Sequence, residues 1–352
     1  MSESKGIDYS FLKGPIQLSI DITNKCNIRC LHCYNYSGEN LYIKDELTDK
    51  ELIKLIDDIC KMKPFNVCFC GGEPLLRKDI LLKLVKKLSD NEINSSVVTN
   101  GILLTKDVAR ELKEAGIGNV QISLDGKKES HERLRGKSGT FESAIEALKN
   151  LKENSINRNI AFSPTSWNIN DFKTVVKVGL DMGVKEIRVQ QLMPIGRASK
   201  NNELIPTNSQ YRNMKRMIIE ADNMVRRLGK SIRFDWGDPI DHLIRYSEQN
   251  IFTYMFGISA NGNIKPSMYL PLSVGNVRKH SIIEYWDKGL YDIYKLDKFK
   301  NMAKNFKSVK NMKTTNYDLP ENFIEEDIQY DIIEEKFLLN LKWYVGRWFF
   351  WN

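Results

Sequence analysis

The chain has 352 residues, of which 41% are hydrophobic and 28% charged, and its formal net charge is +8. This length buries a sizeable core, and the composition excludes a low-complexity chain. The sequence has no run of about 18 apolar residues, so a membrane-spanning helix is not expected. The N-terminal residues lack the pattern of a secretory signal peptide, and we expect a cytoplasmic protein. The positive charge suggests acidic partners, but no feature indicates a specific nucleic acid.

Alternating strand and helix patterns run through the first half of the chain. Residues 16–23 predict a strand, and a helix at 49–62 precedes a short strand at 66–70. Helices at 79–90, 105–115, 141–153 and 169–182 then precede strands at 95–99, 119–124, 158–163 and 186–192. This alternation predicts a parallel sheet. Six strands are fewer than a closed (β/α)8 barrel needs, so we expect an α/β fold with a partial (β/α)6 barrel.

Three cysteines follow the first predicted strand: Cys26, Cys30 and Cys33, with the spacing CxxxCxxC. Thiolates at this density bind soft metals, and four is the usual number around an iron–sulfur cube. Three would leave one iron with an open coordination position. A disulfide or a zinc site is the alternative, and zinc would need His32, which lies between two of the ligands. All six cysteines lie at or before position 70, which favours a reducing compartment over a disulfide framework.

Glycine-rich or polar clusters follow the next three predicted strands. They are Gly71-Gly72-Glu73-Pro74, Asn100-Gly101 and Ser123-Leu124-Asp125-Gly126. The carboxyl ends of parallel barrel strands meet at one edge, so we expect these clusters to form a single site with the cysteines. Glycine lets backbone approach a ligand closely, and a carboxylate such as that of Glu73 accepts strong hydrogen bonds from an ammonium group.

With CxxxCxxC after the first strand and GGEP after the second, the chain resembles the radical S-adenosylmethionine (radical SAM) superfamily over residues 14–195. The resemblance implies that Cys26, Cys30 and Cys33 hold one 4Fe–4S cluster whose open iron binds SAM. One electron would then cleave SAM to methionine and a 5′-deoxyadenosyl radical, which abstracts hydrogen from a substrate. A reducing partner such as flavodoxin or ferredoxin would supply the electron.

The resemblance also implies the residues that contact SAM. Tyr34 would lie against the adenine, Glu73 would accept from the ammonium group, Ser123 would reach a ribose hydroxyl and Arg135 would bind the carboxylate. The full set of expected cofactor-binding residues is Tyr34, Gly71, Gly72, Glu73, Pro74, Asn100, Ser123 and Arg135. For Ser123 and Arg135, strand capping and a surface salt bridge are alternative roles.

Three further cysteines lie close in sequence to the GGEP cluster. Cys60 falls on a predicted helix, and Cys68 and Cys70 share one face of the second strand. Free cysteine is among the most buried residue types, so we expect all three to pack in the core. A role for Cys70 as a hydrogen-atom donor or thiol ligand is the alternative.

Beyond residue 195 the chain resembles the peptide-maturase branch, whose SPASM domain carries auxiliary clusters. The matching segments are Met193–Ala198, Ile258–Pro266, Val274–Val277 and Ile282–Trp286. A cysteine usually follows the proline in that domain, whereas here Ser267 follows and no later cysteine exists. We expect a degenerate domain that keeps its hairpin without the metal. The expected organisation is a lead at 1–13, a radical SAM core at 14–230, a degenerate SPASM-like segment at 231–290 and a helical tail at 291–352.

Two segments of the tail have patterns that suit a membrane surface. Residues 295–313 predict a basic amphipathic helix, and residues 343–352 contain three of the six tryptophans. For the predicted helix, the favoured interpretation is that its apolar stripe packs in the core and its basic face lies in solvent. For the aromatic segment, packing across the partial barrel is an equal alternative.

The leading hypothesis is a radical SAM enzyme that matures a ribosomally made peptide. A second hypothesis is radical modification of a small molecule, such as a sugar, nucleotide, tetrapyrrole or lipid-linked substrate. A third, from another class, is a scaffold without catalysis. A scaffold would bind no cluster and cleave no SAM, and only a peptide maturase would change the mass of a peptide.

The cysteine distribution predicts the iron content. Anaerobic reconstitution should give about four irons per chain, because three clustered thiolates serve one cube. Cys26→Ala should abolish the visible absorbance of the cluster, and Cys60→Ala should leave it intact. Iron and sulfide analysis checks this, and about eight irons per chain would contradict a single cluster.

Overall fold

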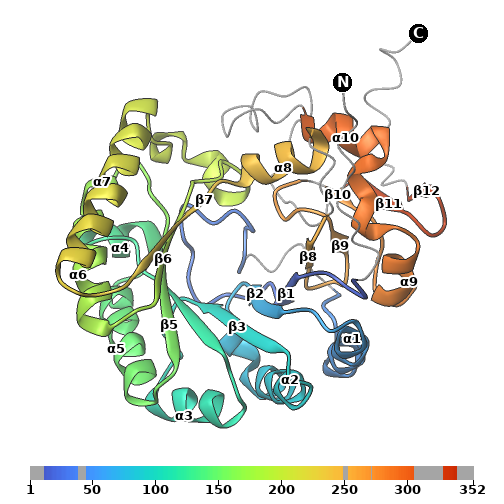
Figure 1. The fold of residues 1–352 in the computed structure, drawn as a ribbon, viewed down its shortest axis with the longest axis horizontal. Helices are drawn as coiled ribbons and strands as arrows, with labels where there is room; N and C mark the ends of the chain where they lie inside the picture. Colours follow the sequence, from blue (N-terminus) through green and yellow to red (C-terminus); the bar gives the residue numbers. More distant parts are fainter. Residues whose placement is uncertain (1–11, 39–44, 249–252, 271, 305–327, 339–352) are drawn as a thin grey trace.

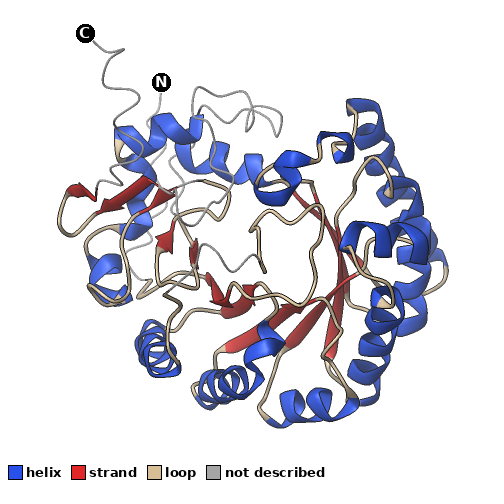
Figure 2. Ribbon diagram, turned by 180° about the vertical axis from the view of Figure 1, so that it is seen from behind, coloured by secondary structure: helices blue, strands red, loops and turns tan. Residues whose placement is uncertain are grey.

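The structure is a computed structural model that describes residues 12–38, 45–248, 253–270, 272–304 and 328–338. A curved sheet forms its centre, and helices cover the outer face of that sheet (Figure 1). Figure 2 shows from behind that the sheet does not close on itself. This is the partial barrel expected from the alternation of strands and helices.

Nine strands form the main sheet, in the order β7-β6-β5-β4-β3-β2-β1-β8-β9. Neighbours are parallel from β7 to β8, and only β9 runs antiparallel to its neighbour. The strands are β1 (Gln17–Thr23), β2 (Asn66–Gly71), β3 (Asn94–Thr99), β4 (Asn119–Ser123), β5 (Asn157–Phe162), β6 (Glu186–Gln190), β7 (Arg233–Gly237), β8 (Met255–Ile258) and β9 (Ile264–Lys265).

Ten α-helices occur in the described part of the chain, most of them on the outer side of the sheet. They are α1 (Asp49–Met62), α2 (Lys78–Asp90), α3 (Lys106–Glu114), α4 (Lys128–Arg135), α5 (Thr140–Glu153), α6 (Phe172–Met182), α7 (Asn208–Arg227), α8 (Pro239–Glu248), α9 (Ile282–Asp287) and α10 (Asp297–Lys304). Capping boxes begin three of these helices, with Thr48 and Glu51 at α1 as one example. None of the helices in the described residues is long and apolar enough to cross a membrane.

The six predicted strands and their connecting helices are confirmed. The sheet nevertheless continues beyond residue 230, because β7 pairs with β6 and β8 pairs with β1 at the opposite edge. Helix α4 was missed. Its sequence is mostly charged, and only Ser130, His131 and Leu134 are buried, so it shows no apolar period.

The two faces of the sheet have opposite character. On β2, Val67 and Phe69 are fully buried against the helices, whereas Asn66, Cys68 and Cys70 line the inner side. The same alternation of inward polar and outward apolar side chains occurs on β1, β4 and β6, since successive side chains of a strand point to opposite faces. The apolar core therefore lies between sheet and helices, and polar side chains of these strands line the inside of the partial barrel.

The second half of the chain adds a hairpin and a small separate sheet. The expected hairpin is present, with β8 antiparallel to β9. A second sheet contains β10 (Leu272–Ser273), β11 (Ile328–Asp331) and β12 (Lys336–Leu338), so the expectation of a wholly helical tail is wrong for residues 328–338.

The basic amphipathic pattern at 295–313 is partly described. Helix α10 covers its first half, and Phe299 and Ala303 are buried in the core. The ring of Phe299 packs edge-on against Tyr330 of β11. This supports the interpretation as a core stripe for that half. Residues 305–313 and the aromatic segment 343–352 lie outside the described residues.

Candidate active site

The strand-end motifs converge on one cavity of about 590 Å³ on the inner side of the sheet. Nine of the residues expected from the sequence line it: Cys26, Cys30, Cys33, Tyr34, Gly71, Gly72, Asn100, Ser123 and Arg135. Glu73 and Pro74 are not among the lining residues. The cavity thus brings the cysteine motif together with residues from the ends of β2, β3 and β4.

The loop that carries the three cysteines is held by Arg197, which follows β6. The backbone N–H of Arg197 donates to the Cys33 carbonyl at 2.8 Å, and its Nε donates to the Cys30 carbonyl at 2.9 Å. Its second guanidinium nitrogen donates to the Ser37 carbonyl at 2.8 Å. Gly196 has φ +59, and a Cβ there would lie 2.2 Å from the Tyr34 carbonyl oxygen. Glycine therefore lets the two loops pack together.

The two glycines of GGEP lie against the start of the cysteine loop. The Gly72 N–H donates to the Thr23 carbonyl at 2.8 Å, and the Glu73 N–H donates to the Lys25 carbonyl at 2.8 Å. A Cβ on Gly72 would lie 2.0 Å from the Lys25 oxygen. Glycine at these two positions therefore lets the turn after β2 pack closely against the start of the cysteine loop. From the sequence we expected these glycines to allow close approach to a ligand.

The Glu73 carboxylate is buried beside the turn that follows β2, and Glu73 is not among the residues that line the cavity. It is fully buried and accepts from the Thr99 hydroxyl at 2.7 Å, the Asn100 N–H at 2.9 Å and the Leu75 N–H at 3.1 Å. Asn100 in turn donates through Nδ2 to Asn27 of the cysteine loop at 2.8 Å. Glu73 therefore supports Asn100 and the turn.

Arg135 forms an ion pair with the buried Asp125, so the alternative of a surface salt bridge is wrong. Its Nη2 lies 2.6 Å from Oδ2 of the fully buried Asp125, and its Nη1 lies 3.7 Å from the Cys30 sulfur. Burial alone would raise the pKa of the Asp125 carboxyl, but its neighbours, with the Arg135 guanidinium as the largest influence, hold that pKa below its ordinary value. The guanidinium thus places positive charge beside one of the three thiols.

The structure does not support a zinc site formed by His32 and the cysteines. Its Nε2 lies 3.6 Å from Asp125, and burial lowers the pKa of its imidazole to about 4, so the ring is neutral near pH 7. In the described residues, no three His, Cys, Asp or Glu side chains are gathered around one point as a single metal ion would need.

The donor set instead suits a group larger than one ion. Cys26, Cys30 and Cys33 line the same cavity and lie near enough for their charges to interact. Burial raises the pKa of the Cys26 thiol, and it raises that of Cys30 to about 12, so a bound metal must displace these protons. Three thiols and the adjacent Arg135 fit an anionic iron–sulfur cluster.

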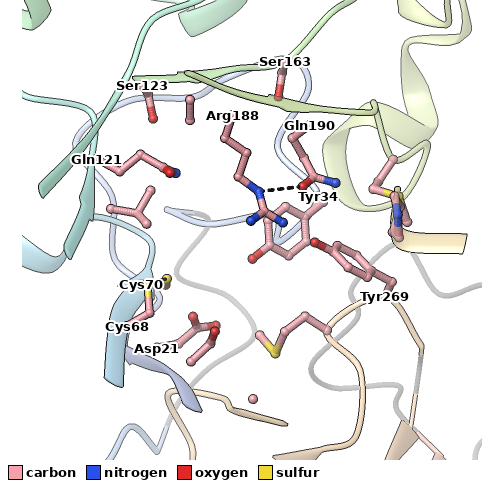
Figure 3. A pocket seen from close by; sticks show the side chains of 18 of the residues that line it. Asp21, Tyr34, Cys68, Cys70, Gln121, Ser123, Ser163, Arg188, Gln190 and Tyr269 are labelled. Carbon is pink, nitrogen blue, oxygen red and sulfur yellow. Dashed lines mark hydrogen bonds between the residues drawn. The ribbon is translucent and has the colours of Figure 1, made fainter. Parts of the chain in front are cut away.

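The interior of the cavity contains polar residues that the sequence analysis did not single out. Figure 3 shows Arg188 and Gln190 of β6 pointing toward Tyr34, Tyr269 and the side chains of β2. The rings of Tyr34 and Tyr269 are 6.1 Å apart. Period-two alternation on β6 could have identified Arg188 and Gln190, but nothing local indicates that the loop after β9 brings Tyr269 to the same cavity.

The prediction that three cysteines pack in the core is correct only for Cys60. Cys60 is buried between α1 and its neighbours, whereas Cys68 and Cys70 line the cavity. Their positions alternate with Val67 and Phe69, and this alternation was visible in the sequence.

Comparison with known proteins identifies one matching family and several relatives. Residues 20–177 match the Radical SAM superfamily. Fe-coproporphyrin III synthase of Methanosarcina barkeri is 32% identical over 51% of this chain and 45% of that protein. The sporulation killing factor maturation protein SkfB of Bacillus subtilis is 26% identical over 87% of this chain and 72% of that protein. The chain thus spans less than half of the first relative.

A solved structure shows the same fold. Streptococcus suis SuiB bound to S-adenosylmethionine has a TM-score of 0.64 and 17% sequence identity, over 80% of this chain and 68% of that one. At this identity the likeness concerns the fold, and it agrees with an α/β partial barrel.

Gly72→Ala should prevent stable cluster binding. The new Cβ would meet the Lys25 carbonyl, so the start of the cysteine loop must move. Iron content after reconstitution and the midpoint of thermal unfolding measure this. The control is Gly139→Ala, whose Cβ would meet nothing within 4 Å although φ is +80. It should cost only about 1–2 kcal/mol of backbone strain and keep the iron. Equal iron loss in both variants would contradict the steric explanation.

Arg197→Ala should loosen the cysteine loop. The Cys30 and Ser37 carbonyls would each lose a charged donor, and a hydrogen bond to a charged group contributes about 1.5–3 kcal/mol. The expected result is faster loss of iron to a chelator. The control is Arg226→Ala, because Arg226 is an exposed residue of α7 paired with Asp222. Iron loss at the same rate in both variants would show that Arg197 does not hold the loop.

Proposed function

We propose that this chain, whose residues 20–177 form a radical SAM domain, uses SAM and one 4Fe–4S cluster to abstract hydrogen from a ribosomally made peptide. The observation that carries the proposal is the convergence of Cys26, Cys30 and Cys33 with Gly71 and Gly72 on one cavity. A scaffold without catalysis would not need all three cysteines to line this cavity.

The three thiolates of Cys26, Cys30 and Cys33 would hold the cluster. A cluster held there would supply the electron that cleaves SAM to methionine and a 5′-deoxyadenosyl radical, and it would bind the amino acid part of SAM. Arg135 lies beside the Cys30 sulfur and would stabilise negative charge there. A low-potential donor such as flavodoxin or ferredoxin would supply the electron.

The residues proposed to bind SAM differ in how they would act. Tyr34, Asn100, Ser123 and Arg135 present side chains on the cavity surface, and Gly71 and Gly72 present backbone. Glu73 and Pro74 would act indirectly. Glu73 orients Asn100 through its backbone N–H, and Pro74 begins the short 3-10 helix that follows the glycines.

The polar cavity wall supports a peptide substrate. Arg188, Gln190 and Tyr269 provide hydrogen-bonding groups suited to backbone amides and side chains. Much of this wall comes from residues beyond 195, including Pro266, Ser267 and Tyr269 of the segment that resembles the peptide-maturase branch. The relative that covers 87% of this chain is a maturation protein by name, which also supports this substrate class.

The alternative is a small-molecule substrate, and a tetrapyrrole is the best-supported member of that class. Its support is the 32% identity to Fe-coproporphyrin III synthase over 51% of this chain. A planar macrocycle would require a wide apolar slot, since ligand sites are mostly apolar with few polar groups. The hydrogen-bonding side chains of Arg188 and Gln190 on the cavity wall favour the peptide.

Co-expression with the small peptides encoded beside the gene tests the substrate class. One such peptide should change in mass, or change in retention time at constant mass, when produced with the intact chain. The change should disappear with Cys26→Ala, which removes a cluster ligand, and persist with Cys60→Ala, which alters only the core. Mass spectrometry with liquid chromatography provides the measurement. Unaltered peptides, together with SAM cleavage by the purified protein, would support the small-molecule alternative.

A further inference from the structure

Cys68 and Cys70 form a pair of thiols on the inner face of β2. Their sulfur atoms are 3.4 Å apart, and both side chains point into the cavity (Figure 3). All six cysteines lie in the described residues, and the other four are accounted for by the CxxxCxxC loop and by Cys60 in the core. This pair has no role in holding the proposed cluster.

The surroundings of the pair are polar and partly unsatisfied. Asp21 of β1 lies directly opposite Cys70 in the strand register, and Ser19 lies opposite Cys68. The Asp21 carboxyl is 1% exposed, and its Oδ1 has no hydrogen-bond partner among the described residues. Burial raises the pKa of Asp21 to about 7, with Lys265 and Asn35 opposing that effect in part. Asp21 can therefore carry a proton near neutral pH.

The pKa values of the two thiols are shifted in opposite directions. The hydrogen bond between them and burial raise the pKa of the Cys70 thiol well above its ordinary value. The same hydrogen bond lowers the pKa of the Cys68 thiol. Cys70 thus keeps its S–H, and Cys68 has the greater thiolate character.

Three simpler roles for the pair fit less well. Core packing is excluded because both side chains line the cavity. A metal site lacks a third ligand, since no group of three His, Cys, Asp or Glu in the described residues is arranged to bind an ion. A disulfide is disfavoured because residues two apart on a strand have Cα atoms about 6.6 Å apart, near the upper limit for that bond.

We propose that the Cys68–Cys70 pair is a hydrogen-atom donor, in which Cys70 gives the hydrogen of its S–H to a carbon radical in the cavity and Cys68 shares the resulting sulfur radical. The inference deepens the proposed function and rests on it, since the cleavage of SAM must supply the radical. An S–H bond is weak enough to be broken by a reactive carbon radical, and an adjacent thiolate stabilises a thiyl radical through a three-electron bond between the sulfurs.

The atoms and electrons of this step balance as follows. The Cys70 S–H bond breaks, a C–H bond forms on the substrate, and the unpaired electron is left on the two sulfurs. One electron from the low-potential donor and one proton restore a thiol on Cys70 and a thiolate on Cys68. Asp21, which faces Cys70 from the neighbouring strand, is placed to deliver that proton.

A specific reaction class follows from this donor. The substrate loses one hydrogen to the SAM-derived radical and regains one from a thiol that exchanges with solvent. The modified carbon therefore ends at its original oxidation level, and its configuration can be inverted. Such chemistry requires no second cluster as electron acceptor, in agreement with the lack of any cysteine after Cys70.

An isotope experiment without peptide tests the donor. The reconstituted holoenzyme would be reduced with dithionite in D2O with SAM alone, and the 5′-deoxyadenosine formed would be measured by mass spectrometry. A Cys70 S–D within the cavity should place one deuterium in this product. Cys70→Ser should lose that deuterium, because an O–H bond is too strong to donate, while hydrogen bonding to Cys68 is kept. Cys60→Ala is the matched control and should keep the deuterium.

A second measurement does not depend on turnover. Iodoacetamide should alkylate Cys68 of the holoenzyme faster than Cys60 at neutral pH, and Cys70→Ala should remove this difference because the hydrogen bond that favours the thiolate is lost. Peptide mapping by mass spectrometry would locate the labels. Iron content should stay unchanged in Cys70→Ser and Cys70→Ala.

Each contrary result has a distinct meaning. Product without deuterium in the unaltered protein, or equal deuterium in Cys70→Ser, would overturn the donor role while leaving the proposed function in place. Iron loss in both Cys70 variants would make the pair part of a metal site and would also overturn it. Absence of any 5′-deoxyadenosine would overturn the proposed function and this inference together.

Discussion

The cysteine loop between β1 and α1 has no helix or strand in its described part, so hydrogen bonds from distant residues determine its conformation. Arg197 binds the carbonyls of Cys30 and Ser37 and donates its own N–H to Cys33. On the other side, the N–H groups of Gly72 and Glu73 bind the carbonyls that begin the loop. The three thiols share one cavity because hydrogen bonds hold the loop between the turns that follow β2 and β6.

A buried ion pair also holds the cysteine loop in place. Asp125 at the end of β4 pairs with Arg135 on α4, and Arg135 reaches the Cys30 sulfur. Truncating one member of such a buried pair leaves the other charge unpaired, which costs more than an exposed ion pair is worth. Arg135 therefore has two roles, since it lines the cavity and also joins the cysteine loop to Asp125 at the end of β4.

The second half of the chain completes the cavity as well as adding elements outside it. Strands β7 and β8 extend the sheet at its two edges, and the loop after β9 contributes Ser267 and Tyr269 to the wall. Ser267 follows Pro266 in this loop, and both residues line the cavity. Together with the thiols on β2, this loop surrounds the space in which a substrate would lie.

The sequence by itself determined the strand and helix order and the spacing of Cys26, Cys30 and Cys33. It also placed the strand-end motifs at one edge, because periodicity and turn residues are local properties of a chain. The tertiary structure decided that the Glu73 carboxylate is buried against Thr99 and Asn100 and that Arg135 pairs with Asp125. It also decided that Cys68 and Cys70 face a cavity. Contacts such as that of Arg197 with Cys30 join residues 167 positions apart. No local pattern encodes them, since they depend on how the turns pack after the sheet has formed.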